Sequence, residues 1–386
     1  MCTIQSVINL LKKVNPSIRT YVICLMLSSG RKNCADMARS VGISSKLLYD
    51  YLDNAKKNSD EIENILIDYV NKTRVEGVVR SLVIDPTALI KSYSTSMENV
   101  CYDRDGCTKH KERCLVPVYA TIVDVNVKIP INIAFWVQKK VIGVKKYKSK
   151  VKIAQDLISY LKSKGVHFDF VSLDGAFPTP SMFAFLKKNN LSFTMRIAKS
   201  RCITLENGER MQLKYCKYLK LMRNSREKTI QAELYGTKYF FTAQKRKRKG
   251  GGWEIIFLVS NMDLSAKDQV SAYKLRWPQE KINRTTKQKF GSNQCQATKA
   301  SKQEAHIMAG FLAHTILELA QNDKQKKSVD KTVNFIRRNH FNDLFKLIEN
   351  HKQHAPMHNV DPVAKNLQND IQILLKNIGL YESLRV

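Results

Sequence analysis

Four side chains that could do chemistry follow one another at helical spacing near residue 280. They are Tyr273, Arg276, Glu280 and Lys287, at offsets of zero, three, seven and fourteen residues. On one continuous helix of about 3.6 residues per turn, these offsets fall within roughly 60° of one another. A carboxylate flanked by cations on one helix face indicates a site where a metal ion and a phosphodiester meet. Ordinary solvated helix faces also carry Lys and Glu at this spacing, so the pattern needs support from elsewhere in the chain.

Two aspartates upstream supply that support. Asp85 ends the apolar run SLVID before Pro86, and Asp174 ends FDFVSLD before Gly175. Either aspartate alone fits an ordinary turn residue at the end of a strand. Three carboxylates at one place repel one another unless a cation joins them. Oxygen ligands favour Mg²⁺, with Mn²⁺ as the alternative, and two such ions can promote in-line phosphoryl transfer.

The elements that must position these carboxylates follow an α/β pattern. Between residues 80 and 200 the apolar periodicity predicts strand, strand, strand, helix, strand, helix, strand. This is the order of the RNase H-like fold, in which the first and fourth strands are neighbours. We therefore expect Asp85, Asp174 and Glu280 to converge. The catalytic core is predicted to comprise residues 80–200 and 263–320.

A β-rich insertion is expected to interrupt this core over residues 201–262. Its alternating strands are separated by KRKRKGGG, which predicts a basic, flexible hairpin tip. The basic residues there include Lys245, Arg246, Lys247 and Arg248. After the helix that carries Glu280, the apolar run HIMAGFLAHTILELA predicts a helix packed on the sheet. Residues 321–386 are expected to form a helical, polar C-terminal region.

Residues 1–75 are predicted to form a helical domain with a helix-turn-helix. Ala38 lies on a first short helix, Gly42 makes the turn, and Ser44 can cap a second helix that buries Leu48 and Tyr51. The second helix would then present Lys46 and neighbouring polar groups to the major groove of DNA. An ordinary helical hairpin is the alternative.

The charge of the chain favours a polyanionic partner. Lys and Arg number 65 and Asp and Glu 34, a formal net charge of +31 at pH 7. Such an excess opposes folding by self-repulsion unless a polyanion offsets it, which predicts double-stranded DNA as the partner. The basic stretches include Lys139, Lys140, Lys145, Lys146, Lys148, Lys150 and Lys152. We find neither a signal peptide nor a membrane anchor in the sequence and expect a cytoplasmic location without membrane association.

The nine cysteines form an odd, unpatterned set, which is typical of reduced thiols in a reducing compartment. One group, Cys101, Cys107, His110 and Cys114, is close enough in sequence to consider zinc. Its spacings match no common zinc module, so zinc there stays a disfavoured alternative.

Taken together, these motifs resemble the DDE transposases of bacterial insertion sequences, specifically the branch with a Tyr-(2)-Arg-(3)-Glu-(6)-Lys signature. The four residues of the opening motif fit that signature at every position. VIDPT around Asp85 and SLDGAF around Asp174 resemble the two aspartate motifs. Trp277, Arg284, Gln288 and GSNQCQATKASKQEAH resemble the family sequence around and after the glutamate. The resemblance spans about residues 80 to 320.

The resemblance implies roles for the matching residues. Asp85, Asp174 and Glu280 would hold two Mg²⁺ ions, and Tyr273, Arg276 and Lys287 would grip the DNA backbone beside the cut, with Arg284 close by. In this family an aromatic residue of the insertion stacks on a flipped base. Trp253 is the candidate, with a tryptophan in the core of a strand as the alternative.

The implied function is that of an insertion-sequence transposase associated with the nucleoid. It would bind terminal inverted repeats, act as a homodimer, cleave DNA strands with Mg²⁺ and join the 3′-hydroxyl to target DNA. An RNase H-like nuclease or resolvase, and a decayed transposase that only binds DNA, are the alternatives. Three residues depart from the family pattern. Pro278 should kink the signature helix or begin a new one, and polar Gln279 and Asn283 should loosen the packing around Glu280.

Overall fold

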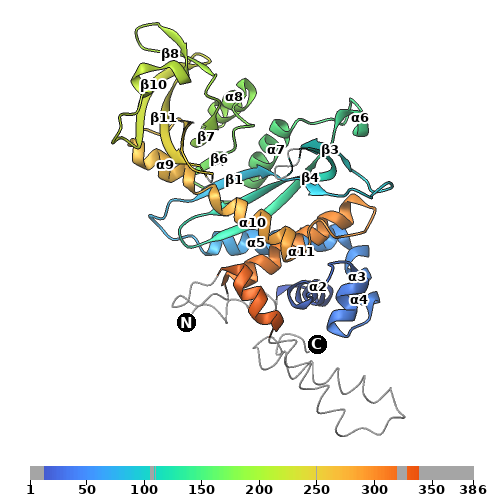
Figure 1. The fold of residues 1–386 in the computed structure, drawn as a ribbon. Coiled ribbons are helices and arrows are strands. Elements are labelled where there is room, and N and C mark those ends of the chain that lie inside the picture. The colour runs from blue at the N-terminus through green and yellow to red at the C-terminus, as the bar shows by residue number, and fades with distance from the viewer. Residues whose placement is uncertain (1–12, 105–107, 109, 249, 320–327, 339–386) are drawn as a thin grey trace, which may run out of the picture.

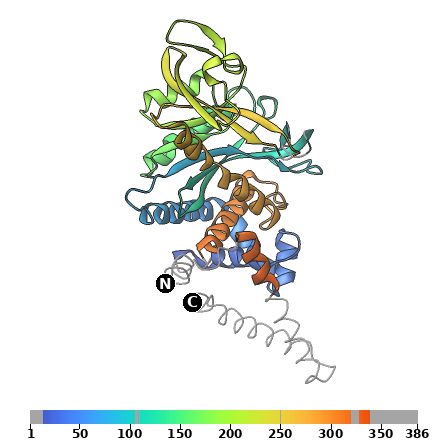
Figure 2. The ribbon, with the colours of Figure 1, turned by 60° about the vertical axis from the view of Figure 1, so that its left-hand side comes forward.

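A mixed β-sheet with helices on both faces forms the centre of this α/β protein (Figure 1). The computed structural model describes residues 13–104, 108, 110–248, 250–319 and 328–338. Within them the sheet has twelve strands, in the order β2-β4-β1-β6-β7-β12-β11-β10-β8-β9, with β3 and β5 paired to β4. Helices α5 and α11 cover one face beside β5, and α7 covers the other (Figures 1 and 2).

The core strands and helices follow the predicted order. They are β1 (Ser81–Pro86), β4 (Lys111–Val123), β5 (Lys128–Trp136), α7 (Lys150–Ser163), β6 (Phe170–Leu173), α8 (Pro180–Lys188) and β7 (Phe193–Ile197). The sequence pattern left out three short elements, β2 (Leu89–Ile90), β3 (Cys101–Arg104) and α6 (Lys139–Ile142). β1 is parallel to β6, and β6 is parallel to β7. The prediction that the first and fourth strands are neighbours in the sheet is therefore confirmed.

Buried side chains explain why these segments pair. Every residue of β6 is buried, as are the first five of β1, which is typical of strands covered on both faces. A buried ion pair fixes the start of β1: Arg80 Nε donates to Asp124 Oδ2 at 2.9 Å, and Arg80 Nη1 donates to the carbonyl of Val70 at 2.7 Å. The Arg80 and Asp124 side chains are only 3% and 2% exposed. This contact joins the end of α5 to the sheet.

The inserted residues extend the same sheet instead of forming a separate one. Their strands are β8 (Cys202–Thr204), β9 (Arg210–Gln212), β10 (Glu227–Leu234), β11 (Thr237–Lys247) and β12 (Trp253–Ser260), and β12 pairs with β7. The expected flexible basic tip is shorter than predicted. Lys245, Arg246 and Lys247 lie within β11 and pair with β12, because the ladder continues to Trp253. Arg248 and the glycines form the turn; Lys249 lies outside the described residues.

The N-terminal helices are α2 (Pro16–Leu27), α3 (Cys34–Val41), α4 (Ser45–Asp53) and α5 (Ala55–Lys72). Gly42 ends α3 with φ of 75°, a conformation that favours glycine, and its N–H donates to the carbonyl of Ala38 at 2.9 Å. Ser44 Oγ accepts from the Lys46 N–H and caps α4. The predicted pair of helices around a glycine turn is therefore present.

Three helices follow the insertion. They are α9 (Ala266–Lys274), α10 (Trp277–Gln288) and α11 (Ala300–Leu319). α11 is largely buried against β5, α2 and α5, as its apolar sequence predicts. Of the predicted C-terminal region, residues 329–338 are helical, and residues 321–327 and 339–386 lie outside the described residues, as do residues 1–12 at the other end.

Candidate active site

Asp85 and Asp174 lie at the carboxyl ends of two strands, on the same side of the sheet. Asp85 is the last residue but one of β1, and Asp174 directly follows β6. Because β1 and β6 are parallel neighbours, their carboxyl ends carry the two aspartates side by side. Asp85 is only 8% exposed, whereas Asp174 is half-buried and its Oδ1 accepts from the N–H of Gly175.

Arg276 joins Asp85 to Glu280. Its Nη1 donates to Asp85 Oδ1 at 3.1 Å, and its Nη2 donates to Glu280 Oε1 at 2.5 Å. The guanidinium carbon lies 5.7 Å from the centre of the buried Tyr273 ring. The third donor, Nε, is buried and has no hydrogen-bond partner among the described residues. Arg276 therefore links two of the three predicted carboxylates, and its Nε N–H stays unused.

A pair of buried amides positions Asp85 from the other side. Gln279 Nε2 donates to Asn283 Oδ1 at 2.7 Å, and Asn283 Nδ2 donates to Asp85 Oδ2 at 3.0 Å. Gln279 is fully buried and Asn283 is 8% exposed. The expectation that these polar residues loosen the packing around Glu280 is wrong. Each amide finds a partner one helical turn away or across the strand end, so together they fix the carboxylate.

The helix that carries the signature is broken. α9 ends at Lys274, Leu275 and Arg276 form a turn, and α10 begins at Trp277 with Pro278 in its first turn. The prediction that all four signature residues lie along one face of a single helix is therefore wrong, because Tyr273 lies on α9. Pro278 does begin a new helix, as expected. Proline suits this place because its missing N–H would have no partner in a first turn. The break points Arg276 at both carboxylates.

The buried carboxyl of Asp85 is unusually easy to protonate. Burial raises its pKa to about 7, and the charges of Asp174 and Glu280 add to this effect, although Arg276 and Asn283 oppose it. Both neighbouring carboxylates are thus close enough to act electrostatically on Asp85. One guanidinium does not compensate three acidic groups, so the site is short of positive charge.

The donor set fits a hard divalent cation in chemical type. All three side chains offer oxygen ligands, which Mg²⁺ and Mn²⁺ prefer. Within the described residues, however, no three His, Cys, Asp or Glu side chains lie close enough together to hold an ion as they stand. Arg276 occupies the position between Asp85 and Glu280. In this arrangement the guanidinium supplies the positive charge that a metal would supply.

A basic groove of about 700 Å³ adjoins Glu280. Its walls come from β7, β11, β12, α9 and α10. They carry Arg196, Gln244, Arg246, Lys247, Arg248, Glu254, Ile256, Tyr273, Lys274, Arg276, Trp277 and Glu280. Arg196 and Trp277 were not predicted as site residues. In the sequence, Trp277 was named only for its resemblance to the family sequence, and no sequence signal marked Arg196.

The predicted DNA-binding residues fall into two groups. Lys245, Arg246, Lys247, Arg248 and Trp253 lie on the insertion, and the three from Arg246 to Arg248 line the groove. Arg246 pairs with Glu254 at 2.8 Å, and Lys245 Nζ lies 5.2 Å from the ring centre of Trp253. Trp253 is 57% exposed, so the alternative of a core tryptophan is wrong.

The remaining predicted contacts lie away from this groove. Arg284 is exposed on α10 and forms an ion pair with Asp330 at 3.5 Å. Lys287 is half-buried near the end of α10, and Lys46 is exposed on α4. Thus the structure brings Tyr273 and Arg276 to Glu280, but it places neither Lys287 nor Arg284 in the wall of the groove.

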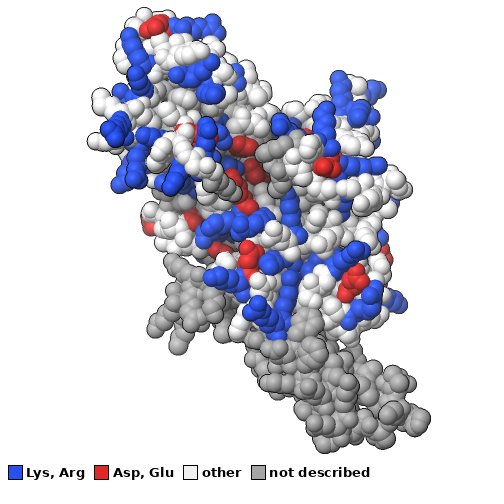
Figure 3. All heavy atoms as spheres, viewed as in Figure 1, with Lys and Arg blue, Asp and Glu red and all other residues white. Residues whose placement is uncertain are grey.

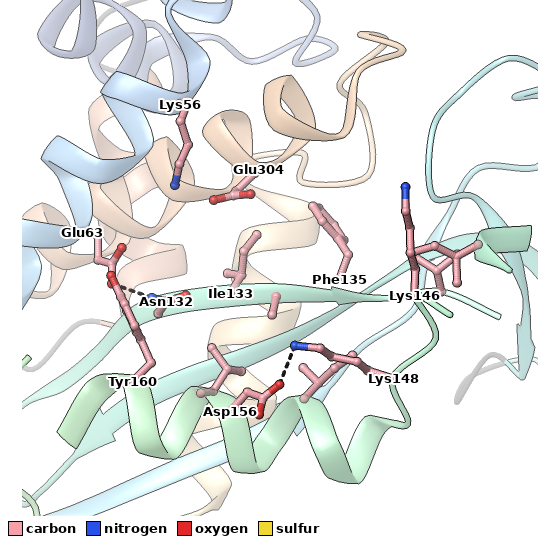
Figure 4. A pocket seen from close by; sticks show the side chains of 15 residues that line it. Lys56, Glu63, Asn132, Ile133, Phe135, Lys146, Lys148, Asp156, Tyr160 and Glu304 are labelled. Carbon is pink, nitrogen blue, oxygen red and sulfur yellow. Dashed lines mark hydrogen bonds and ion pairs between the residues drawn. The ribbon is translucent and has the colours of Figure 1, made fainter. Parts of the chain in front are cut away.

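A second pocket, of about 470 Å³, lies beside the edge strand β5 between α5, α7 and α11 (Figure 4). Two of its acidic residues, Glu63 and Asp156, already have partners. Asn132 Nδ2 donates to Glu63 Oε1 at 2.6 Å, and Lys148 pairs with Asp156 at 2.7 Å. Burial raises the pKa of Glu63 and of Glu304. The contact between Asn132 and Glu63 connects α5 to the sheet, and both contacts are separate from the carboxylates at the ends of β1 and β6.

The disfavoured zinc site gains no support. Cys101 and Cys114 lie opposite each other on β3 and β4, both buried, and burial raises the pKa of each thiol. Cys107 lies outside the described residues. None of the described helices is long and apolar enough to cross a membrane.

Comparison with protein families matches two overlapping parts of the chain. Residues 11–215 match the family described as DDE superfamily endonuclease, and residues 122–316 match the family described as transposase DDE domain. The first match includes Asp85 and Asp174, and the second includes Asp174 and Glu280. The two together therefore cover all three predicted acidic residues. Curated proteins gave no match.

Proposed function

The chain belongs to the DDE superfamily of endonucleases and transposases, and we propose that it is an active transposase of an insertion sequence, of the branch named above. It would bind the terminal inverted repeats of its own element, cut strands at the ends and join the exposed 3′-hydroxyl to target DNA. The observation that carries this proposal is the meeting of Asp85, Arg276 and Glu280 where β1 ends, beside a basic groove.

The carboxylates Asp85, Asp174 and Glu280 would hold the divalent ions. When bound, Mg²⁺ or Mn²⁺ would lower the pKa of an attacking water or hydroxyl and stabilise the leaving oxygen. The contribution of this chain is to hold the acids in place. Asp85 is fixed by the amide pair of Gln279 and Asn283, and Glu280 is exposed at the mouth of the groove, where a scissile phosphate can approach.

Arg276 would act on the DNA as well as on the acids. Its planar fork suits a phosphate as well as a carboxylate, and its Nε is already unused. As DNA enters the groove, Arg276 would exchange both carboxylates for phosphate oxygens and leave Asp85 and Glu280 free as ligands. Tyr273, buried against the guanidinium, would keep it close to the groove wall.

The rest of the molecule would hold the DNA. Arg246, Lys247 and Arg248 would contact the backbone of the element end, and the exposed Trp253 would stack on an extruded base. The α3–α4 pair, with Lys46 exposed, would read the repeat farther from the cut. A homodimer would hold both ends together, so that each end meets one catalytic site.

One observation favours a second candidate, a decayed transposase that only binds DNA. Asp85 and Glu280 are engaged with Arg276 instead of forming a ready metal cluster. A protein whose arginine never releases these acids would bind DNA without cutting it.

A strand-transfer assay separates the readings. The protein is mixed with pre-cut duplexes of the inverted repeats that flank its gene, a supercoiled plasmid and Mg²⁺. Plasmid molecules covalently joined to the duplex would support the transposase. Metal-dependent nicking without joined products would support a nuclease or resolvase, and a gel shift with neither product would support the decayed binder.

A further inference from the structure

A second basic surface lies on the side of the sheet where the strands that carry the aspartates end. It consists of four exposed lysines on α6 and the loop after it, Lys139, Lys140, Lys145 and Lys146, and we call it the lysine surface. None of the four forms an ion pair with a described residue. The function described above uses the groove on the insertion side and leaves these charges without a role.

The lysine surface is held at both ends. Gln138 exchanges hydrogen bonds with the backbone of Tyr102, donating to its carbonyl at 2.6 Å and accepting from its N–H at 3.4 Å. At the far end Lys150 pairs with Asp103 at 2.5 Å. The segment is thus tied twice to strand β3, so its lysines are presented from a fixed place.

The neighbouring charges distinguish the lysine surface from the structural lysines after it. Lys148 and Lys152 both pair with Asp156 on α7. Figure 4 shows Lys148 turned toward Asp156, while the amino group of Lys146 points away from Asp156. The strand β4 beside the surface adds two further cations, Lys111 and Arg113, with one carboxylate, Glu112, between them. Positive charge therefore accumulates here beyond what local carboxylates neutralise.

The sheet topology places this surface on one side of the carboxylates and the insertion on the other. β1 and β5 are both antiparallel to β4, so the end of β5 points the same way as the ends of β1, β6 and β7. The lysine surface follows β5, Asp85 ends β1, Asp174 follows β6, and the insertion follows β7. From β5 to β7 the path crosses four strand spacings, about 19 Å.

The surface view agrees with this order. Figure 3 shows acidic side chains in a hollow near the middle of the face, with Lys and Arg over the insertion on one side and over the α6 region on the other. Two basic surfaces with an acidic centre between them suit two nucleic-acid segments that meet at the carboxylates.

The types of cation differ between the two sides. The groove carries mostly arginines with an exposed tryptophan, groups that bind phosphate bidentately and stack on bases. The lysine surface carries point charges on flexible stems, and within the described residues no helix longer than the four-residue α6 lies among them to enter a DNA groove. Such charges bind the backbone of a duplex without reading its sequence.

We propose that the lysine surface binds the target DNA, a second duplex of any sequence, into which the cut end is joined. This inference rests on the proposed transposase function. Catalysis requires target and end to meet at the carboxylates, and this surface flanks them on the side that the end does not occupy.

The test uses the full-length protein with Lys139, Lys140, Lys145 and Lys146 all changed to Gln. Native and variant proteins are first saturated with unlabelled duplex of the flanking inverted repeats, in EDTA. Capture of a labelled random-sequence duplex of about 30 base pairs is then followed by fluorescence anisotropy over a range of salt concentrations. The matched control changes Lys162, Lys164, Lys187 and Lys188 to Gln, four exposed lysines at the ends of α7 and α8, on the opposite edge of the sheet.

We expect the variant to capture the random duplex about tenfold less tightly. The slope of the logarithm of its binding constant against the logarithm of salt concentration should be smaller in magnitude by about three to four. The control should behave as the native protein, and binding of the first duplex should change less than about twofold in either variant. Unchanged capture, an equal loss in the control, or an equal loss of the first duplex would each overturn the proposal. Because this assay needs no catalysis, failure of the proposed function shows separately, as native protein that does not cut its ends in Mg²⁺.

Discussion

Asn283 donates from Nδ2 to Asp85 Oδ2 across 3.0 Å, and this contact ties helix α10 to the end of strand β1. The two residues are 198 positions apart in the chain. Gln279 holds the other end of the Asn283 amide, so only one orientation of that amide satisfies both neighbours. The relationship makes Asn283 a positioning residue for Asp85.

Removing that amide should weaken the metal site selectively. We expect Asn283→Ala to lower Mg²⁺-dependent cleavage by about 10- to 100-fold, the usual loss when the group that orients a ligand is removed. DNA binding in EDTA should stay within about twofold of native, because Asn283 lies behind the carboxylate. Cleavage rates at increasing Mg²⁺ measure the effect.

A matched control is Gln269→Ala. Gln269 is also a fully buried amide and donates to the carbonyl of Met262, but it lies on α9 and touches none of the acids. It should lower thermal stability and leave the Mg²⁺ requirement as in the native protein. If both variants shifted that requirement equally, Asn283 would have only a general structural role.

Arg276 should oppose metal binding in the absence of DNA. Arg276→Gln removes the charge that engages Asp85 and Glu280, so at about pH 8 we expect Mn²⁺ to bind roughly threefold more tightly or better. Cleavage should nevertheless fall by at least about 100-fold, because the phosphate contact is lost. Isothermal titration with Mn²⁺ and a cleavage assay give the two numbers. Weaker Mn²⁺ binding in the variant would show that Arg276 does not compete with the metal.

Metal affinity should depend on pH through Asp85. Burial raises the pKa of this carboxyl to about 7, and the ion binds only the ionised form. Mn²⁺ affinity should therefore rise about tenfold per pH unit below about pH 7 and level off above it. Because the folded protein holds this proton more tightly than the unfolded chain, Asp85 also lowers native stability as pH rises from about 4 to about 7.

Titrations of native protein and Asp85→Asn at several pH values check both statements. The variant should lose Mn²⁺ binding and should show a smaller fall in unfolding free energy over that range. A native affinity that does not vary between about pH 6 and pH 8 would contradict this account of Asp85.

The buried pair of Arg80 and Asp124 should matter for stability and not for chemistry. Arg80→Met leaves Asp124 buried without its cation, which costs about 3–5 kcal/mol of unfolding free energy. The pair lies at the start of β1, at the opposite end of this strand from Asp85. Urea unfolding measures the loss, and cleavage by the folded fraction should equal that of native protein. A loss below about 1 kcal/mol would mean that water solvates Asp124 in the variant.

The sequence predicted the core elements because each combines an apolar run with a clear boundary. Pro86 and Gly175 mark the ends of β1 and β6 in the sequence; in the structure, Ser149 and Thr179 also cap the helices between the core strands. The same logic placed both aspartates at one edge of the sheet, since the carboxyl ends of parallel neighbours coincide.

The packing around Glu280 could not be predicted from local pattern. Gln279 and Asn283 are polar at positions that a packed helix usually gives to apolar residues, and periodicity alone indicates a defect there. Asn283 donates to the end of a strand almost two hundred residues away and Gln279 donates to Asn283, so only the folded chain shows what these amides hold in place. Likewise, Pro278 shows that the helix is interrupted but not that the break directs Arg276 at two acids.

The measurement closest to the central claim is the cutting of end DNA by Glu280→Gln. This change keeps the shape of the side chain and an oxygen for Arg276 but removes the charge needed to hold a metal. The matched control is Glu304→Gln, the same change on α11 beside the other pocket. With Mg²⁺, the native protein and the control should cut at equal rates, and Glu280→Gln should be slower by about 1,000-fold or more, with DNA binding retained. Cutting by Glu280→Gln at the native rate, or native cutting that persists in EDTA, would contradict the account.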